Sequence, residues 1–211
     1  TDKFLSKPVY LFGHSMGGLL AAMAVQSRPA YFAGLAMMSP FFAPNKDVAP
    51  LYKRVLTKVF GRVLPKVPIG ALDVRLISRD PAVVDYMTHD LLRHHGDVPL
   101  GWAAASLRAG EHFRAKINLI SVPIFLQVAC EDKICDVDAM KSFFQEVPSI
   151  HKKIKIYGGA YHNLLTEPDG IREQGFKDIA EWFNERLSTP LAFTSPAQSG
   201  KDDSGQAAGH S

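Results

Sequence analysis

The stretch Val9-Tyr10-Leu11-Phe12-Gly13-His14-Ser15-Met16-Gly17-Gly18 decides the fold of this 211-residue chain. A short apolar run leads into the motif Gly-x-Ser-x-Gly, and small apolar residues follow at once in 19–25. This order of strand, turn and helix is typical of a nucleophile elbow, a strained turn that presents a serine hydroxyl beyond the strand end. We predict that side chains at Gly13 or Gly17 would crowd the turn. Ser15 is therefore the candidate nucleophile.

A simpler structure fits the same residues. A glycine-rich turn between a strand and a helix can bind phosphate at the helix N-terminus. Gly13 and Gly17 also match a dinucleotide-binding turn loosely. The rest of the chain has to distinguish these possibilities.

The composition is typical of one globular domain, with 46% hydrophobic and 21% charged residues. A formal net charge of +3 indicates no nucleic-acid partner. Cys130 and Cys135 have neither zinc nor redox spacing, which predicts free thiols in a reducing compartment and no metal site. No apolar segment approaches the ~18 residues that span a bilayer.

Strand-like and helix-like segments alternate along most of the chain. Strands are expected at 9–12, 32–39, 122–129 and 153–157, and helices at 16–28, 136–147 and 169–187. This alternation predicts an α/β fold with a mostly parallel sheet. The last helix is expected to present one apolar face, made of Phe176, Ile179, Ala180, Phe183 and Leu187. Residues 190–211 are expected to form a disordered tail.

Residues 41–117 differ from the rest and predict a helical insertion. Helices are expected at 80–93 and 99–113, and basic residues outnumber acidic ones over 45–117. Residues 51–64 place apolar side chains along one helical stripe and basic ones beside it. Such a helix can lie on a membrane surface. The commoner arrangement packs the stripe on the protein itself.

Ser15, Asp132 and His162 follow the order nucleophile, acid and histidine of α/β-hydrolases. Each comes directly after a predicted strand, and loops at the carboxyl ends of parallel strands meet at one edge of the sheet. Glu131, Asp136 and Asp138 also compete for the role of the acid, although Asp136 is well placed to cap the next helix.

Two further residues near these loops have competing interpretations. His14 is adjacent to Ser15, and because neighbouring residues point to different faces we interpret it as a packing residue. Cys135 is either a reactive thiol close to the site or an ordinary buried cysteine.

Four stretches closely resemble the monoglyceride lipase family of α/β-hydrolases over about residues 8–187. They are Gly13-His14-Ser15-Met16-Gly17-Gly18, Phe32-Ala33-Gly34-Leu35 with Ser39-Pro40, Glu131-Asp132-Lys133-Ile134-Cys135-Asp136, and Lys155-Ile156-Tyr157-Gly158-Gly159-Ala160-Tyr161-His162. The resemblance implies that Ser15, Asp132 and His162 form a catalytic triad. It also implies that the Met16 backbone N–H is one oxyanion donor.

The resemblance implies a lipid substrate as well. The insertion resembles the family's lid, whose helix touches membranes and admits lipid, with Leu51, Leu56, Val59 and Leu64 as candidate substrate-binding residues. The implied reaction is hydrolysis of monoacylglycerols to fatty acid and glycerol, without metal or organic cofactor, by a cytoplasmic protein bound peripherally to membranes. Two alternatives stay open: a lysophospholipase or general carboxylesterase, and an inactive truncated product that binds lipid or protein.

The family fold has eight strands, and its first four would precede Thr1. A His-Gly loop that supplies the second oxyanion N–H would also precede Thr1. We therefore expect residues 1–189 to be an incomplete hydrolase domain from a longer protein, carrying a lid at about 41–117.

Overall fold

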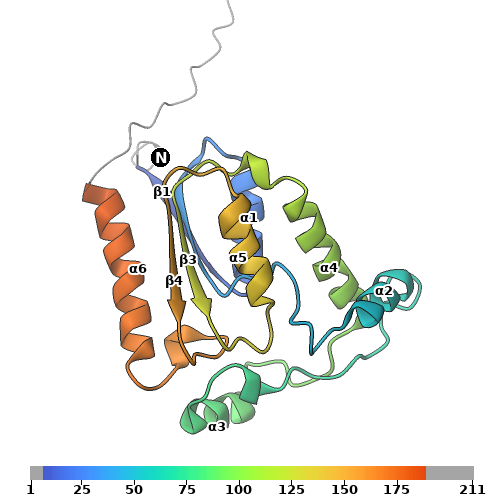
Figure 1. The fold of residues 1–211 in the computed structure, drawn as a ribbon. Coiled ribbons are helices and arrows are strands. Elements are labelled where there is room, and N and C mark those ends of the chain that lie inside the picture. Colours follow the sequence, from blue (N-terminus) through green and yellow to red (C-terminus); the bar gives the residue numbers. More distant parts are fainter. Residues whose placement is uncertain (1–6, 189–211) are drawn as a thin grey trace, which may run out of the picture.

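The computed structural model describes residues 7–188, so the predicted tail at 190–211 lies outside the described residues. Four parallel strands form one sheet in the order β1 (Val9–His14), β2 (Phe32–Met38), β3 (Ile124–Ala129) and β4 (Lys152–Tyr157) (Figure 1). Parallel neighbours require crossover connections. Here these contain α1 (Met16–Ser27), a helical insertion and α5 (Val137–Glu146). The α/β prediction is confirmed.

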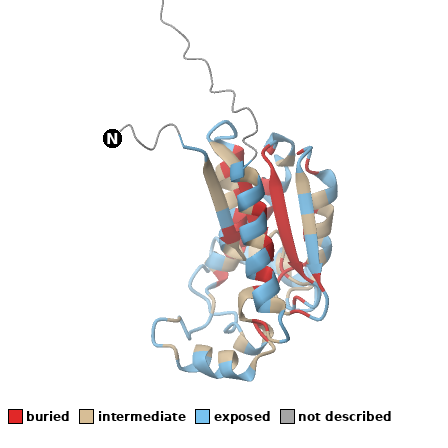
Figure 2. Cartoon of the chain, turned by 90° about the vertical axis from the view of Figure 1, so that its left-hand side faces the viewer, coloured by how far each residue is buried: buried red, intermediate tan, exposed pale blue. Residues whose placement is uncertain are grey.

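Helices cover both faces of the sheet (Figure 1). On one face, α1, α5 and α4 (Leu100–Arg114) enclose the larger core, to which Leu19, Met37, Phe113, Leu126 and Met140 belong. All six residues of β3 are buried (Figure 2), as expected for an interior strand covered on both faces.

The opposite face is covered by α6 (Ile171–Ser188). Its anchor is Trp182, which stacks on Phe125 with ring centroids 6.1 Å apart and lies close under Gly34. Phe176 and Leu187 are instead 54% and 57% exposed, so the apolar face expected for this helix is wrong at both. The face of α6 that carries Trp182 packs on the sheet instead, because this large ring fills the space there.

The insertion between β2 and β3 contains α2 (Leu51–Phe60), α3 (Pro81–His89), α4 and the short 3₁₀ helices η2 (Val74–Leu76) and η3 (Ile117–Leu119). Stacked aromatic rings join α4 to the core, with the centroids of Phe42 and Phe113 4.8 Å apart. After β4, the 3₁₀ helix η4 (Leu164–Thr166) precedes α6. The insertion lies partly beside the sheet and partly beyond its carboxyl end (Figure 1).

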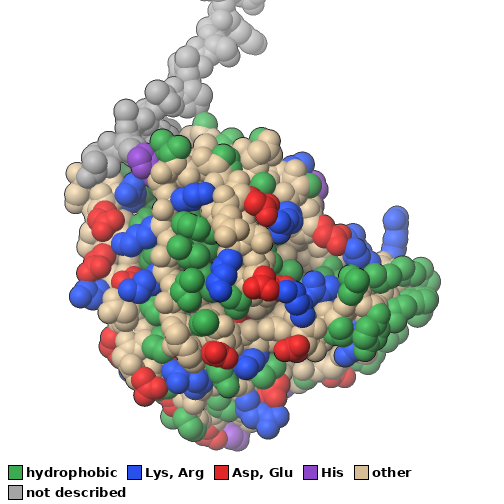
Figure 3. Space-filling view, in the orientation of Figure 1, with side chains coloured by type: hydrophobic (Ala, Val, Ile, Leu, Met, Phe, Trp, Pro, Cys, Tyr) green, Lys and Arg blue, Asp and Glu red, His purple; other side chains and the backbone are tan. Residues whose placement is uncertain are grey.

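Helix α2 turns its apolar stripe outward. Its Arg54 donates hydrogen bonds to the Ala49 and Pro44 carbonyls at 2.6 and 2.5 Å, and Lys58 pairs with Glu111 at 2.7 Å. Figure 3 shows hydrophobic side chains gathered at the end of the molecule where α2 lies in Figure 1. The commoner arrangement for an amphipathic helix, with its stripe against the protein, is therefore wrong here. Among the helices of residues 7–188, none has both the length and the apolar character needed to cross a bilayer.

Candidate active site

Ser15 occupies a strained turn between β1 and α1. Its φ of 54° and ψ of −123° are unusual for a residue with a side chain. Backbone hydrogen bonds hold the turn: the Ser15 N–H donates to the Met38 carbonyl at 3.0 Å, and the Ser15 carbonyl accepts from Phe41 N–H at 2.9 Å. This conformation is that of the predicted elbow.

The glycines of the motif are not equivalent. A Cβ at Gly13 would lie 2.4 Å from the Gly17 carbonyl oxygen, so a side chain there is excluded. A Cβ at Gly17 would meet nothing within 4 Å, and the prediction that Gly17 avoids crowding is therefore wrong. The second close approach belongs to Gly18, where a Cβ would lie 2.8 Å from Pro40 Cβ.

Asp132 and His162 meet at the carboxyl end of the sheet. Asp132 follows β3 and His162 follows β4, and His162 Nδ1 lies 2.8 Å from Asp132 Oδ2. The other carboxylate oxygen, Oδ1, accepts the N–H groups of Ile134 and Cys135, both at 2.8 Å. Both side chains are buried, which strengthens the interaction between them.

The other candidate acids are engaged elsewhere. Glu131 pairs at 3.7 Å with Lys133, and Asp138 pairs at 2.7 Å with Lys46 at the surface. Asp136 Oδ1 accepts the Asp138 and Ala139 N–H groups, which confirms its predicted role as the cap of α5. Of the four acids, Asp132 is therefore the one that contacts the histidine.

His14 packs directly against His162, with ring centroids 4.8 Å apart. Its Nε2 is buried, and within residues 7–188 this atom has no hydrogen-bond partner. Burial lowers the pKa of His14 to about 4, and the neighbouring His162 adds to this effect. His14 is thus neutral at pH 7 and acts as a packing residue, as predicted from its position beside Ser15.

Cys135 lies under the same group of side chains. Its sulfur, an Asp132 oxygen and a His162 nitrogen lie within 4.8 Å of one another. Burial raises the pKa of the Cys135 thiol, as does the charge of Asp132. A protonated thiol is a poor metal ligand, and both Asp132 oxygens already accept hydrogen bonds. The chemistry of Cys135, Asp132 and His162 therefore favours a hydrogen-bond network over a metal centre.

The remaining predicted residues lie in two places. Met16 is the first residue of α1, where backbone N–H groups have no partner within the helix. The four candidate substrate-binding residues belong to the insertion and are exposed there by 76, 50, 59 and 48% for Leu51, Leu56, Val59 and Leu64.

Two contacts beside the Asp132–His162 pair were missed from the sequence. Asn45 Nδ2 donates at 2.8 Å to the Asp132 carbonyl, and Glu167 accepts a hydrogen bond from the Tyr161 N–H at 3.0 Å. Asn45 comes soon after the carboxyl end of β2, a location that could have drawn attention to it. Nothing in the local pattern distinguishes Glu167 from a surface acid.

A strained serine after one parallel strand, with an acid and a histidine joined at the same sheet edge, defines the class of α/β-hydrolases. Within that class, the chain belongs to the serine aminopeptidase S33 family, whose sequence profile matches residues 1–169.

Known relatives agree with this assignment. The chain is 31% identical to the monoglyceride lipase of Homo sapiens over 182 residues, which cover 86% of this chain and 60% of that protein. It is 27% identical to a monoacylglycerol lipase of Mycolicibacterium smegmatis, with 85% and 63% covered. The crystal structure of Paleococcus ferrophilus monoacylglycerol lipase superposes with a TM-score of 0.78 at 28% identity, covering 86% of this chain and 70% of that one. The chain thus spans about 60% of the curated relatives' length.

Proposed function

We propose that the protein is a serine hydrolase that cleaves the ester bond of monoacylglycerols to fatty acid and glycerol. The observation that carries the proposal is the 2.8 Å contact between His162 and Asp132 at the sheet edge where Ser15 occupies its strained turn. The similarity to monoglyceride lipases supports the choice of substrate.

In the proposed reaction Ser15 Oγ attacks the ester carbonyl carbon while His162 Nε2 takes the hydroxyl proton. Asp132 accepts the His162 Nδ1–H, which fixes the tautomer and stabilises the imidazolium. His162 then donates its proton to the glycerol oxygen as the ester bond breaks. Water, activated by His162, hydrolyses the acyl ester on Ser15 and releases the fatty acid.

The negative charge on the carbonyl oxygen needs hydrogen-bond donors. The Met16 N–H, at the start of α1, is the donor that we assign in this chain, and the N-terminus of the helix favours an anion there. The second donor is expected from the His-Gly loop that the family resemblance implies.

The exposed stripe on α2 supports a lipid substrate. We propose that Leu51, Leu56, Val59 and Leu64 contact lipid when the insertion, residues 41–117, acts as a lid on a membrane surface. Nearby basic side chains favour an anionic surface. The protein would then be peripherally bound in the cytoplasm, where its two free cysteines stay reduced.

A fluorophosphonate probe tests the nucleophile in the native protein. Labelling is expected in the wild type and is expected to be lost in Ser15→Ala. Ser27→Ala serves as the matched control, since Ser27 lies in α1 with its hydroxyl exposed and bonded to the Ala24 carbonyl. Equal labelling of wild type and Ser15→Ala would contradict the proposed mechanism.

Hydrolysis rates on monoolein and lysophosphatidylcholine test the substrate. Faster turnover of monoolein is expected, and it should disappear in Ser15→Ala. Preference for lysophosphatidylcholine would favour the lysophospholipase alternative. Lack of turnover on both, together with lack of labelling, would favour a binding protein.

A further inference from the structure

Glu167 is a buried acid next to the histidine loop but separate from the Asp132–His162 pair. Its side chain has 0% exposure. One oxygen accepts the Arg79 N–H at 2.8 Å, and the other accepts Arg79 Nε at 2.7 Å and the Tyr161 N–H at 3.0 Å. Two of these three donors are backbone N–H groups, and one of the two belongs to the residue immediately before His162.

Two more hydrogen bonds fasten the same loop beyond His162. The Asn163 N–H donates to the Ile77 carbonyl at 2.9 Å, and the Ser78 hydroxyl donates to the Thr166 carbonyl at 2.7 Å. We call residues 77–79, with these bonds to 161–167, the histidine-loop clamp. It connects the backbone on both sides of His162 to the part of the insertion that leads into α3.

Burying the carboxylate of Glu167 costs desolvation free energy. Its desolvation opposes folding, so a buried ion pair adds less stability than apolar side chains of similar volume often would. The pair of Glu167 and Arg79 instead fixes the relative orientation of the groups that it joins, because charge-assisted hydrogen bonds are short and depend on geometry. Such precision matters beside a general base, whose position relative to the nucleophile controls the rate.

We propose that Glu167 is a positioning residue for His162, and that Arg79 makes this positioning depend on the insertion. The inference rests on the proposed role of His162 as the general base. When the clamp is closed, the backbone on both sides of His162 is held, and the imidazole stays in line with Asp132. When residues 77–79 move away, the Asn163 N–H loses the Ile77 carbonyl, Glu167 loses both of its hydrogen bonds from Arg79, and the histidine loop is released.

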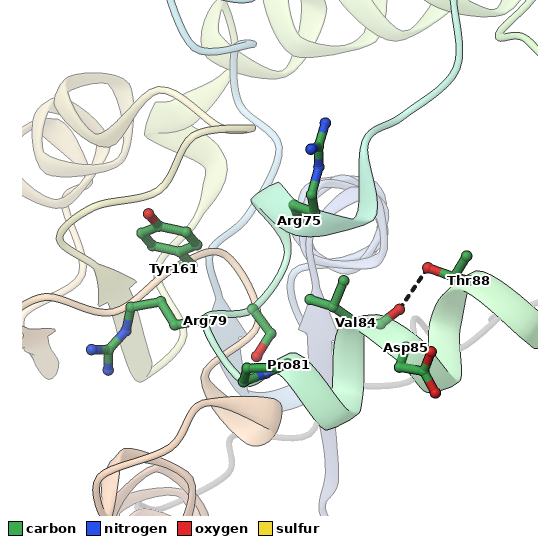
Figure 4. A pocket seen from close by; sticks show the side chains of 8 residues that line it. Arg75, Arg79, Pro81, Val84, Asp85, Thr88 and Tyr161 are labelled. Atoms are coloured by element: carbon green, nitrogen blue, oxygen red, sulfur yellow. Dashed lines mark hydrogen bonds between the residues drawn. The ribbon is translucent and has the colours of Figure 1, made fainter.

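The surroundings of the clamp allow it to be tested with limited damage to the fold. A cavity of about 520 Å³ opens beside it, bordered by Arg79 and Tyr161 on one side and by α3 on the other (Figure 4). Arg79 is 30% exposed, whereas Glu167 is fully enclosed. A shorter side chain at residue 79 therefore leaves a space that water can fill instead of a dry void.

The experiment compares Glu167→Gln, Arg79→Met and Arg79→Lys in the native protein. Gln keeps the size of Glu167, but its NH₂ group faces at least one of the N–H donors. Lys keeps a cation beside Glu167 and Met does not. Asp73→Asn is the matched control, because Asp73 lies in the same insertion and, within residues 7–188, its carboxylate accepts hydrogen bonds from Arg75 alone.

Turnover is measured on monoolein and divided by the number of sites labelled by a fluorophosphonate. We expect kcat per site to fall about 10-fold or more in Glu167→Gln and Arg79→Met, with KM within about twofold of wild type. Arg79→Lys should retain more turnover than Arg79→Met, and Asp73→Asn should match the wild type. A role in stability alone would lower the melting temperature and leave kcat per site unchanged, and that result would overturn the proposal.

A second readout does not depend on activity. The His162 Nδ1–H bonded to Asp132 should give a downfield proton resonance, expected to broaden or shift in Glu167→Gln and to stay unchanged in Asp73→Asn. An unchanged resonance in Glu167→Gln would overturn the positioning role. If the wild type were neither active nor labelled, the proposed function would fail, whereas this resonance would still decide whether Glu167 positions His162.

Discussion

The two glycines on either side of Ser15 differ in what they do for the turn. Gly13 faces the Gly17 carbonyl at a distance that excludes a methyl group, whereas Gly17 faces open space. We expect Gly13→Ala to lower the free energy of unfolding by about 1–3 kcal/mol, as overpacking does. Gly17→Ala should change it by about 1 kcal/mol or less, because alanine is also the better helix former. Denaturant unfolding of the two variants measures the difference, and equal destabilisation would contradict the steric argument.

Asp132 and Asp136 both accept backbone N–H groups, but only Asp132 also contacts His162. In Asp132→Asn an amide NH₂ can face His162 Nδ1, which places the imidazole proton on Nε2, where a base must accept one. We expect kcat to fall by roughly 10³- to 10⁴-fold, as in serine proteases.

Asp136→Asn is the matched control for this change, since Asn caps a helix about as well as Asp. Its kcat should stay within about threefold of wild type. Similar losses of activity in the two variants would indicate that the effect comes from the fold of this loop.

His14 gives the protein a pH-dependent stability. Its pKa is lowered from 6.5 to about 4 by burial and by His162, so between these pH values the folded protein binds fewer protons than the unfolded chain. The free energy of unfolding therefore decreases as pH falls through this window, by roughly 3 kcal/mol in total. His14→Gln should show a correspondingly smaller decrease between pH 7 and pH 4. If the free energy of unfolding had the same pH dependence in wild type and variant, this role of His14 would be contradicted.

At the scale of single elements, α2 is the helix on which the proposed contact with a membrane depends. Leu56 and Val59 project from its outer face, 50% and 59% exposed. We expect Leu56→Asp with Val59→Asp to weaken binding to anionic lipid vesicles roughly 10-fold or more, because both apolar side chains lose their contact with lipid.

The control places the same charges on another helix. Phe176→Asp with Leu187→Asp changes side chains of similar exposure on α6, which covers the opposite face of the sheet. Vesicle binding of this variant should remain near wild type. Fluorophosphonate labelling of Ser15 should remain near wild type in both the α2 and the α6 double variants. Unchanged binding after the α2 substitutions would exclude this helix as the membrane contact.

The sequence allowed the elements to be predicted better than their orientations. Apolar runs and helix caps depend on neighbouring residues, and the four strands and the cap at Asp136 were found in this way. The outward stripe of α2 and the turn of α6 toward Trp182 depend on partners distant in the chain. Glu167 could not be recognised for the same reason, since its partner Arg79 is 88 residues away.

At the scale of the whole molecule, the sheet has a free edge at β1 within residues 7–188. In the part of the chain that the structure describes, strand β1 pairs only with β2, and Ser15 follows its carboxyl end. In residues 7–188 its outer edge therefore has backbone N–H and C=O groups without a neighbouring strand. Free edges of apolar strands pair readily with other chains.

We therefore expect the 211-residue chain, expressed by itself, to self-associate at micromolar concentrations through β1. Phe12 is 42% exposed on this strand, and Phe12→Lys should increase the monomer fraction because charged side chains on an edge oppose strand pairing. Phe176→Lys, at a position 54% exposed on α6, removes a similar apolar surface away from the edge and should leave the association unchanged. Sedimentation velocity measures all three proteins. A monomeric wild-type chain, or equal effects of both substitutions, would show that the β1 edge does not drive association.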